Sequence, residues 1–432
     1  MSSNQPIIQF NPKLPRLSTN ERTTLKLLVE AGKLIAPIYL EQENQARKGP
    51  GKEEIEKAAK KDPSMLSPYS VVEKIDGKLV ATPYHIKYKK LLEPVAEKLN
   101  QAADKTDNKE FGRALRIQAK ALIEGIYEQA SITWLRVKPY ILDISIGPVD
   151  HHDDQLFSGK ASYQAWVGTP DTEGTKRLNN YKSIILSARR KTFMPTKKVE
   201  NHDKVKAKTI DVILFAGFLA RTKFVGVNLP TDINFVAKYG SEITIFNQPN
   251  DLRMKEQILP SFHKIFSKEF KEGFSLEDLG RASLRYIAMH ELAHSYLYYE
   301  NASENLQDLF QCIYELAATV LGLRMSGSLL LKDRITSKQL ESMIVAYICR
   351  SFFLAEKSNL NKSMVTYARA GTIFISFMLE SGALKESKGM AIPNFMKIFV
   401  SLHDLSYMLE HLLASGTRKD AEVFIKKYGK LK

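Results

Sequence analysis

The sequence predicts an α+β fold that is mostly helical, on three observations. Apolar residues recur at helical spacing over the N-terminal third and again from Asp251 to the C-terminus. Short alternating segments between these two regions predict strands. The chain has 432 residues and is 44% hydrophobic, enough for two or three packed lobes. We therefore expect a helical N-terminal region (1–135), a sheet-containing region (136–250) and a helical region (251–432).

The N-terminal region is expected to hold long helices. A polar start at Ser18 precedes apolar positions at helical spacing over 18–45, and residues 87–131 repeat the pattern. A proline-containing loop is expected near 62–68.

Strands are expected where apolar residues alternate. Residues 140–148 alternate in this way and end at the Gly147-Pro148 stop. Further strand candidates are residues 161–167, 210–215, 224–228 and 241–246.

The charge pattern favours solvated helix faces over a nucleic-acid interface. The formal net charge is +15, but most lysines alternate with glutamates, and the one dense basic stretch, 189–208, resembles a linker. Nucleic acid is therefore not an expected partner. An electrostatic binder of nucleic acid or acidic membrane remains a third, weaker hypothesis.

Cysteine content and apolar runs bear on the compartment. Cys312 and Cys349 are the only cysteines, which excludes a disulfide scaffold and indicates a reducing compartment. Residues 1–20 lack an apolar signal core, and no apolar run is long enough to span a bilayer. We expect a soluble, cytoplasmic protein, with non-classical export left open. The oligomeric state is not indicated.

The most specific motif is His-Glu-x-x-His at 290–294. On a helix, His290 and His294 lie one turn apart on the same face, so both imidazoles can reach one metal ion. Glu291 can then take a proton from a water at the open position of the metal. The helix is expected to begin near Ser275, where Ser-Leu-Glu-Asp resembles a capping box.

A third ligand is expected on the next helix, predicted at about 304–323. Its segment 309–323 is apolar almost all round, and Glu315 is its only charge. A buried carboxylate needs a cation or a hydrogen-bond network. Alternatives are a chance motif and a salt bridge from Glu315 to a basic residue, but the combination favours a zinc site, Zn²⁺ being the expected cofactor.

Several segments together resemble the dipeptidyl peptidase III family of zinc peptidases, particularly its shorter microbial branch. The likeness is spread over most of the chain. It is carried by residues 17–22, 28–32, 67–72, 81–85, 146–150, 160–166, 227–232 and 314–323.

The resemblance implies a fold and a set of roles. The fold would have two lobes around a cleft, a helical zinc-bearing lobe and a lobe containing a small sheet or barrel. By position, His290, His294 and Glu315 would hold zinc, with Glu291 as general base.

The remaining implied residues would contact substrate. Asp150 falls near an acid that faces the substrate amine in the family, and His152 near a tyrosine. Asn228 and Pro230 would belong to the cleft wall. Catalytic candidates on the oxyanion side are Tyr367, Arg369 and His152.

The chain departs from the family pattern around the third ligand. Tyr314 and Thr319 replace two acids of the Glu-Glu-x-x-Ala-Asp segment, acids that would orient the ligating histidines. Asp150-His151-His152 also replaces a Glu-and-Tyr pattern.

The sequence thus predicts a zinc metallopeptidase that hydrolyses peptide bonds in short peptides, with an exopeptidase of the dipeptidyl peptidase III type suspected. An extended peptide is expected to add to the sheet near 141–147 or 161–167. The alternative is a catalytically weakened, zinc-peptidase-like binding or regulatory protein.

Overall fold

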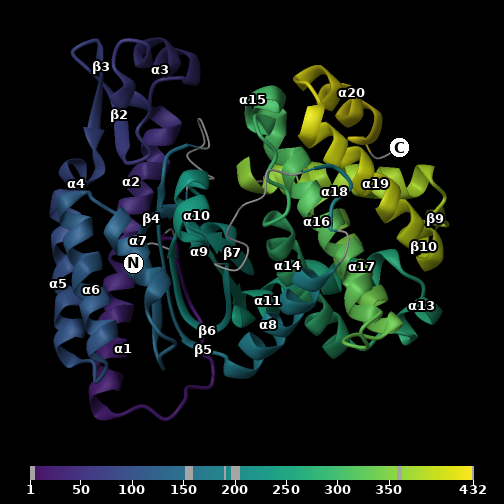
Figure 1. Ribbon diagram of the computed structural model, residues 1–432, viewed down its shortest axis with the longest axis horizontal. Helices are drawn as coiled ribbons and strands as arrows, with labels where there is room; N and C mark the ends of the chain where they lie inside the picture. Colours follow the sequence, from purple (N-terminus) through teal and green to yellow (C-terminus); the bar gives the residue numbers. More distant parts are fainter. Residues whose placement is uncertain (1–4, 151–158, 189–190, 196–204, 358–361, 431–432) are drawn as a thin grey trace. The chain divides into compact units, whose positions relative to one another are not determined.

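The computed structural model describes residues 5–150, 159–188, 191–195, 205–357 and 362–430 (Figure 1). The chain divides into two compact units. The first takes in the described residues up to Thr175 and most of those from 205 to 248. The second takes in described residues between 176 and 195, the short segment Val225–Val227, and the chain from Pro249 onward.

A mixed sheet organises the first unit. Its strands follow the order β4-β5-β6-β8-β7, and β1 pairs with β6 off this path. Strand β6 is long enough to have β5 along one edge and, along the other, β8 at its start and β1 at its end. The strands are β1 (Ile7–Gln9), β4 (Asp143–Asp150), β5 (Ser162–Pro170), β6 (Lys206–Gly217), β7 (Gly226–Leu229) and β8 (Glu242–Phe246).

All five strands predicted for the sheet are present. Each lies within a few residues of its expected position, because alternating or continuous apolar runs mark half-buried and fully buried strands. β1 had not been anticipated.

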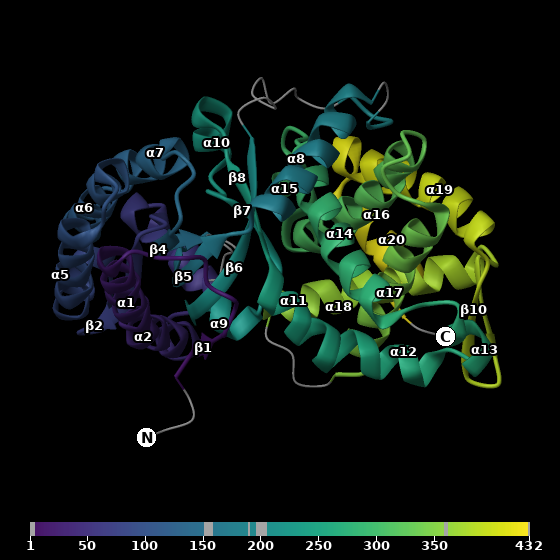
Figure 2. The same ribbon diagram turned by 90° about the horizontal axis from the view of Figure 1, so that it is seen from below.

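Helices cover the sheet of the first unit. Helices α1 and α2 pack on strands β5 and β6, α5 packs on α1, and α6 packs on α5 (Figures 1 and 2). One hydrophobic core joins these helices to β4, β5 and β6. The region 1–135 and the sheet region therefore share a core. The helices are α1 (Thr19–Lys33), α2 (Ile35–Lys48), α3 (Lys52–Ala59), α4 (Tyr84–Lys87), α5 (Lys89–Lys105), α6 (Lys109–Glu124), α7 (Glu128–Arg136), α8 (Thr172–Ser187), which continues into the second unit, α9 (Phe218–Thr222) and α10 (Ile233–Tyr239).

A hairpin follows the loop expected near 62–68. Residues Pro63–Leu66 form a 3₁₀ turn, η1, and β2 (Ser70–Ile75) then pairs antiparallel with β3 (Lys78–Pro83). The hairpin differs from the prediction of a helical region with one loop.

The second unit is a helical assembly, as predicted for residues 251–432. Its one hairpin within the described residues is β9 (Leu384–Ser387) with β10 (Met390–Pro393). Its helices are α11 (Asn247–Arg253), which begins in the first unit, the π-helical turn η3 (Met254–Ile258), α12 (Leu259–Ile265), α13 (Lys268–Glu272), α14 (Leu276–His294), α15 (Ala302–Leu306), the 3₁₀ turn η4 (Gln307–Leu309), α16 (Phe310–Leu330), α17 (Ser337–Ala355), α18 (Lys362–Glu380), α19 (Phe395–Ser415) and α20 (Arg418–Tyr428).

None of the helices in the described part of the chain combines the length and apolar character needed to cross a membrane.

Candidate metal centre

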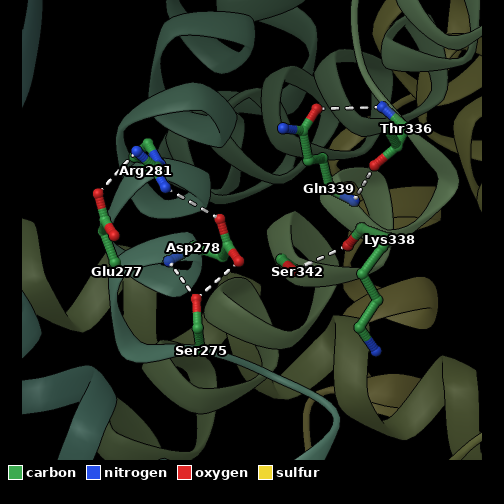
Figure 3. A network of polar contacts seen from close by, with 8 residues as sticks. All are labelled: Ser275, Glu277, Asp278, Arg281, Thr336, Lys338, Gln339 and Ser342. Carbon is green, nitrogen blue, oxygen red and sulfur yellow. Dashed lines mark hydrogen bonds and ion pairs between the residues drawn. The ribbon is translucent and has the colours of Figure 1, made fainter.

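The motif helix α14 begins where the sequence predicted. Ser275 is its N-cap and accepts the backbone N–H of Asp278 at 3.0 Å, and the Ser275 hydroxyl donates to the Asp278 carboxylate (Figure 3). The neighbouring helix α17 begins with a full capping box of Thr336 and Gln339 (Figure 3). These caps satisfy N–H groups that a helix cannot pair internally, which fixes where each helix starts.

Three side chains converge where α14 meets α16. The Nε2 atoms of His290 and His294 lie 3.1 Å apart. One carboxylate oxygen of Glu315 lies 3.2 Å from Nε2 of His290 and 3.8 Å from Nε2 of His294. In the described part of the chain, these are the residues that could jointly hold a metal ion. Helix α15 and the turn η4 precede α16. Because α16 begins at Phe310, Glu315 lies in its second turn.

The separations suit a tetrahedral ion. Zinc–nitrogen and zinc–oxygen bonds of about 2.0–2.1 Å put neighbouring ligand atoms about 3.3 Å apart in a tetrahedron. The observed distances of 3.1, 3.2 and 3.8 Å bracket this value. Two nitrogens and one carboxylate oxygen are also a ligand set typical of catalytic zinc. The residues present therefore fit zinc.

Thr319 indicates which ring nitrogen of His290 carries the hydrogen. Its hydroxyl donates to the carbonyl of Glu315 at 3.2 Å, so its oxygen is left to accept from Nδ1–H of His290 at 2.9 Å. The imidazole then has its lone pair on Nε2, the atom that faces Glu315. A hydrogen bond of this kind orients a metal-ligating histidine. Thr319 thus takes the position that the family resemblance assigned to an acid.

We expect Thr319→Val to weaken zinc binding by about 10–100-fold, because Nδ1–H of His290 loses its acceptor while the side-chain volume is kept. Competition against a zinc chelator measures the change. Thr319→Ser keeps a hydroxyl and should bind zinc as the parent does. Equal affinities of the valine and serine variants would contradict the assigned role.

Gly322 lets the two ligand-bearing helices approach. A Cβ at this position of α16 would lie 2.7 Å from the backbone oxygen of Met289 and 2.9 Å from the backbone nitrogen of His290. Real Cβ atoms do not come this close to backbone, so any side chain would push α16 away from α14. The convergence of Glu315 with the two histidines depends on this contact.

We expect Gly322→Ala to lower the free energy of unfolding by about 1–3 kcal/mol and to weaken zinc binding. Gly327 provides a matched control on the same helix, because nothing lies within 4 Å of an added Cβ there. Gly327→Ala should be neutral or stabilise by up to about 1 kcal/mol. Chemical denaturation of both variants measures the difference, and the same sign for both would rule out the close-approach argument.

The general-base candidate Glu291 is held in a confined place. It is 8% exposed, and its Cγ and Oε1 lie 3.0 Å from where a Cβ of Gly226 would be. The absence of a side chain at Gly226, at the start of β7, therefore leaves room for the Glu291 carboxylate. Gly226 was not identified from the sequence.

Tyr314 replaces the first acid of the family segment and packs against a ligand. Its ring lies 4.7 Å from that of His294 and stacks on Phe310 at 5.1 Å. Burial raises the pKa of Tyr314 well above its usual value, and the charges of Glu315 and Glu291 add to this. The phenol stays protonated, so Tyr314 restrains His294 by packing.

Tyr367 lies beside the third ligand. Its hydroxyl hydrogen-bonds to Glu315, and the guanidinium of Arg350 lies 5.0 Å from the centre of its ring. Burial raises the pKa of Tyr367 well above its usual value, the charges of Glu315 and Glu291 raise it further, and Arg350 opposes them. Tyr367 is therefore a neutral hydrogen-bond donor. Arg350, from α17, was not anticipated.

Arg369 and His152 are the other two predicted catalytic residues. Arg369 is exposed on α18, and its charge acts on the thiol of Cys312, where burial raises the pKa. His152 lies outside the described residues. The described contacts do not bring Arg369 to the ligands.

The predicted substrate residues belong to the first unit. Asp150 is buried at the end of β4, opposite Ser162 of β5. Asn228 is half-buried on β7. Pro230 lines a cavity of this unit.

Strand addition at the expected segments is restricted. Strand β5 is paired on both edges, so it cannot accept a peptide. Strand β4 is an edge strand, but the side-chain nitrogen of Trp134 donates to the carbonyl of Ile144, and that of Gln118 to the carbonyl of Ile146. Peptide pairing along 161–167 is therefore wrong, and pairing along 141–147 would have to displace these side chains.

Comparison with known proteins bears mainly on the fold. No protein-family model matches the chain. Among curated proteins it is similar to Nudix hydrolase 3 of Arabidopsis thaliana, with 21% identity over 360 residues. The match covers 81% of this chain and 46% of the plant protein, so the chain spans about half the length of that relative.

Two solved structures match nearly the whole chain. Dipeptidyl-peptidase III from Corallococcus sp. strain EGB superposes with a TM-score of 0.83 and 19% identity, covering 98% of this chain and 91% of that one. DPP III from Caldithrix abyssi superposes with a TM-score of 0.79 and 19% identity, and the match covers 96% of this chain and 91% of that one. The chain has the fold of these structures, which confirms the predicted mostly helical α+β class and a dipeptidyl-peptidase III-like fold.

Proposed function

We propose that this protein is a zinc-dependent peptidase that hydrolyses peptide bonds in short peptides. The observation that carries the proposal is the convergence of His290, His294 and Glu315 within 4.8 Å of one another, with Glu291 adjacent in sequence. The fold shared with dipeptidyl-peptidase III structures supports the same chemistry.

The ligands supply a site, and the other residues supply proton transfer. A zinc ion at the three ligands would lower the pKa of a water to about 7 and polarise the scissile carbonyl. The Glu291 carboxylate accepts the proton of the attacking water and delivers it to the leaving amine. The neutral phenol of Tyr367 donates its one proton to Glu315 and holds that side chain in place. It could donate to negative charge developing on the carbonyl oxygen only by leaving Glu315.

The substrate class follows the family resemblance. We propose an exopeptidase that prefers unblocked N-termini, with Asp150, Asn228 and Pro230 on the substrate side. A free α-amino group is a cation at neutral pH, so a buried carboxylate such as that of Asp150 would favour it. Free and N-acetylated versions of one peptide test this: equal cleavage would exclude an N-terminal anchor.

Metal analysis and a peptide digest test the proposal as a whole. We expect about one zinc per chain, hydrolysis of a peptide mixture, loss of hydrolysis with a chelator and recovery on adding zinc. Bound zinc with no hydrolysis of any peptide would overturn the peptidase proposal and favour the alternative, a zinc-peptidase-like binding or regulatory protein. Thr319 and Tyr314 hold the histidines by other means than acids, which weakens the main reason for that alternative.

A further inference from the structure

Two arginine side chains are buried close together in the second unit. Arg253 ends helix α11 and is 5% exposed, and Arg350 lies on α17 and is 6% exposed. Both belong to the part of the chain from Pro249 onward, in which the turn η3 that follows Arg253 packs against α17. The charge of Arg350 acts directly on Arg253, so the two guanidinium groups are neighbours.

Neither guanidinium group is paired with an acid. In the part of the chain that the structure describes, no ion pair joins Arg253 or Arg350 to a carboxylate, and Glu315 accepts the hydroxyl of Tyr367 instead. Nε and Nη1 of Arg253 and Nε of Arg350 are buried without a hydrogen-bond partner. Buried charges are normally paired, because an unpaired ion loses its hydration without compensation. These two arginines therefore lack the counter-charge that their burial requires.

Both arginines remain charged at neutral pH. Burial, followed by repulsion from Arg350, lowers the pKa of Arg253 to about 10, which is still well above neutrality. A buried lysine or carboxyl group can escape the cost of burial by becoming neutral, but an arginine keeps its proton. The cost of the two unpaired charges is thus removed only by a negative charge from outside the chain.

The groups around the two arginines are neutral phenols. Tyr286 faces the guanidinium of Arg253, and its ring centre lies 5.7 Å from that of Tyr347, one turn before Arg350 on α17. The guanidinium of Arg350 lies 5.0 Å from the ring centre of Tyr367. Burial raises the pKa of both Tyr347 and Tyr367, so neither phenol supplies negative charge.

We propose that Arg253 and Arg350 together bind one small monovalent anion, of the size of a chloride ion. An anion between the two guanidinium groups would pair both charges and would accept from their unpaired N–H groups. The low exposure of both side chains restricts the ligand to a small ion. The site goes beyond the proposed hydrolysis, because it uses neither the metal ligands nor Glu291.

Thermal unfolding of the metal-free protein at constant ionic strength tests the site. Potassium gluconate, whose anion is too large to enter, is replaced stepwise by potassium chloride. We expect Tm to rise by about 2 °C or more and to saturate, because an anion that binds only the folded state stabilises that state. An unchanged Tm, or a change that never saturates, would overturn the proposal. A larger saturable rise with sulfate would also overturn it, because the ligand would then be divalent.

Two variants locate the anion. Arg253→Met and Arg350→Met each keep an unbranched side chain but remove one of the two charges. In gluconate the remaining guanidinium is no longer repelled, so Tm should be equal to or higher than that of the parent. The rise in Tm with chloride should fall to less than half in each variant. A chloride response as large as that of the parent in both variants would place the anion elsewhere and exclude this site.

Arg281→Met is the matched control, because it removes the same charge from an exposed position of α14, where Arg281 pairs with Glu277 at 2.8 Å. Its chloride response should equal that of the parent. Crystals of the parent soaked in bromide give an independent readout if neither variant folds. An anomalous peak is expected between the two guanidinium groups, and water in that place without a peak would contradict the proposal. Since all these measurements use metal-free protein, an absent anion site and an absent peptidase activity are told apart.

Discussion

Replacing Glu291 with glutamine is expected to reduce kcat by about 10²–10⁴-fold while zinc content stays at the parent level. Glutamine has the volume of glutamate, so it fits the space beside Gly226, but it cannot accept the proton of the attacking water. Because Glu291 is not one of the three converging ligands, the metal should be retained. The free energy of unfolding should change by less than about 1 kcal/mol.

The same substitution elsewhere on α14 is the control. Glu277 lies in the first turn, where its carboxylate pairs with Arg281 at 2.8 Å and its side chain is 75% exposed (Figure 3). Glu277→Gln removes an exposed ion pair worth at most about 0.5 kcal/mol and should leave kcat unchanged. A Glu291→Gln variant as active as the parent would exclude Glu291 as the base.

The elements predicted best are those whose signal is local. The five sheet strands and α14 follow from apolar periodicity and from a capping serine, which depend on neighbouring residues alone. The expected helix over 18–45 is in fact two helices, α1 and α2, that meet at Leu34. Both halves keep helical spacing, so the break leaves little trace in the pattern.

The missed hairpin β2–β3 did have a signal. Asp76 and Gly77 connect two alternating segments, and both have positive φ, 49° and 78°. Asp-Gly is a preferred pair for a two-residue hairpin turn, because both central positions require left-handed backbone. The prediction of a mainly helical N-terminal region did not use this signal.

In the candidate site, too, the residues predicted from the sequence are those with a local signal. The sequence identified His290, His294 and Glu315 because helical spacing brings two ligands to one face and a lone acid in an apolar helix requires a partner. Thr319 and Gly322 act only through the way α16 crosses α14, so no local pattern could show their roles. From the sequence, Thr319 counts as a departure from the family pattern, because a hydroxyl replaces an acid; in the structure this hydroxyl contacts His290 at 2.9 Å.

Replacing His294 with alanine is expected to weaken zinc binding by more than about 100-fold, the upper end of what loss of a hydrogen bond to a ligand causes. The parent protein has three ligand atoms with separations of 3.1–3.8 Å, and the variant has two. A ligand that binds only the folded state raises the stability of that state. Zinc should therefore raise the Tm of the parent and leave that of His294→Ala nearly unchanged.

His263→Ala is the matched control, since His263 is an exposed histidine on α12 in the same unit. It should keep about one zinc per chain and the full zinc-dependent rise in Tm. The two readouts also separate a folding defect from a binding defect: a His294→Ala protein that unfolds cooperatively but shows no response to zinc has lost the site alone. If that variant kept full zinc occupancy, the ion would have to lie elsewhere. Glu315 would then be a buried acid stabilised by the hydrogen bond from Tyr367, and the peptidase proposal would lose its basis.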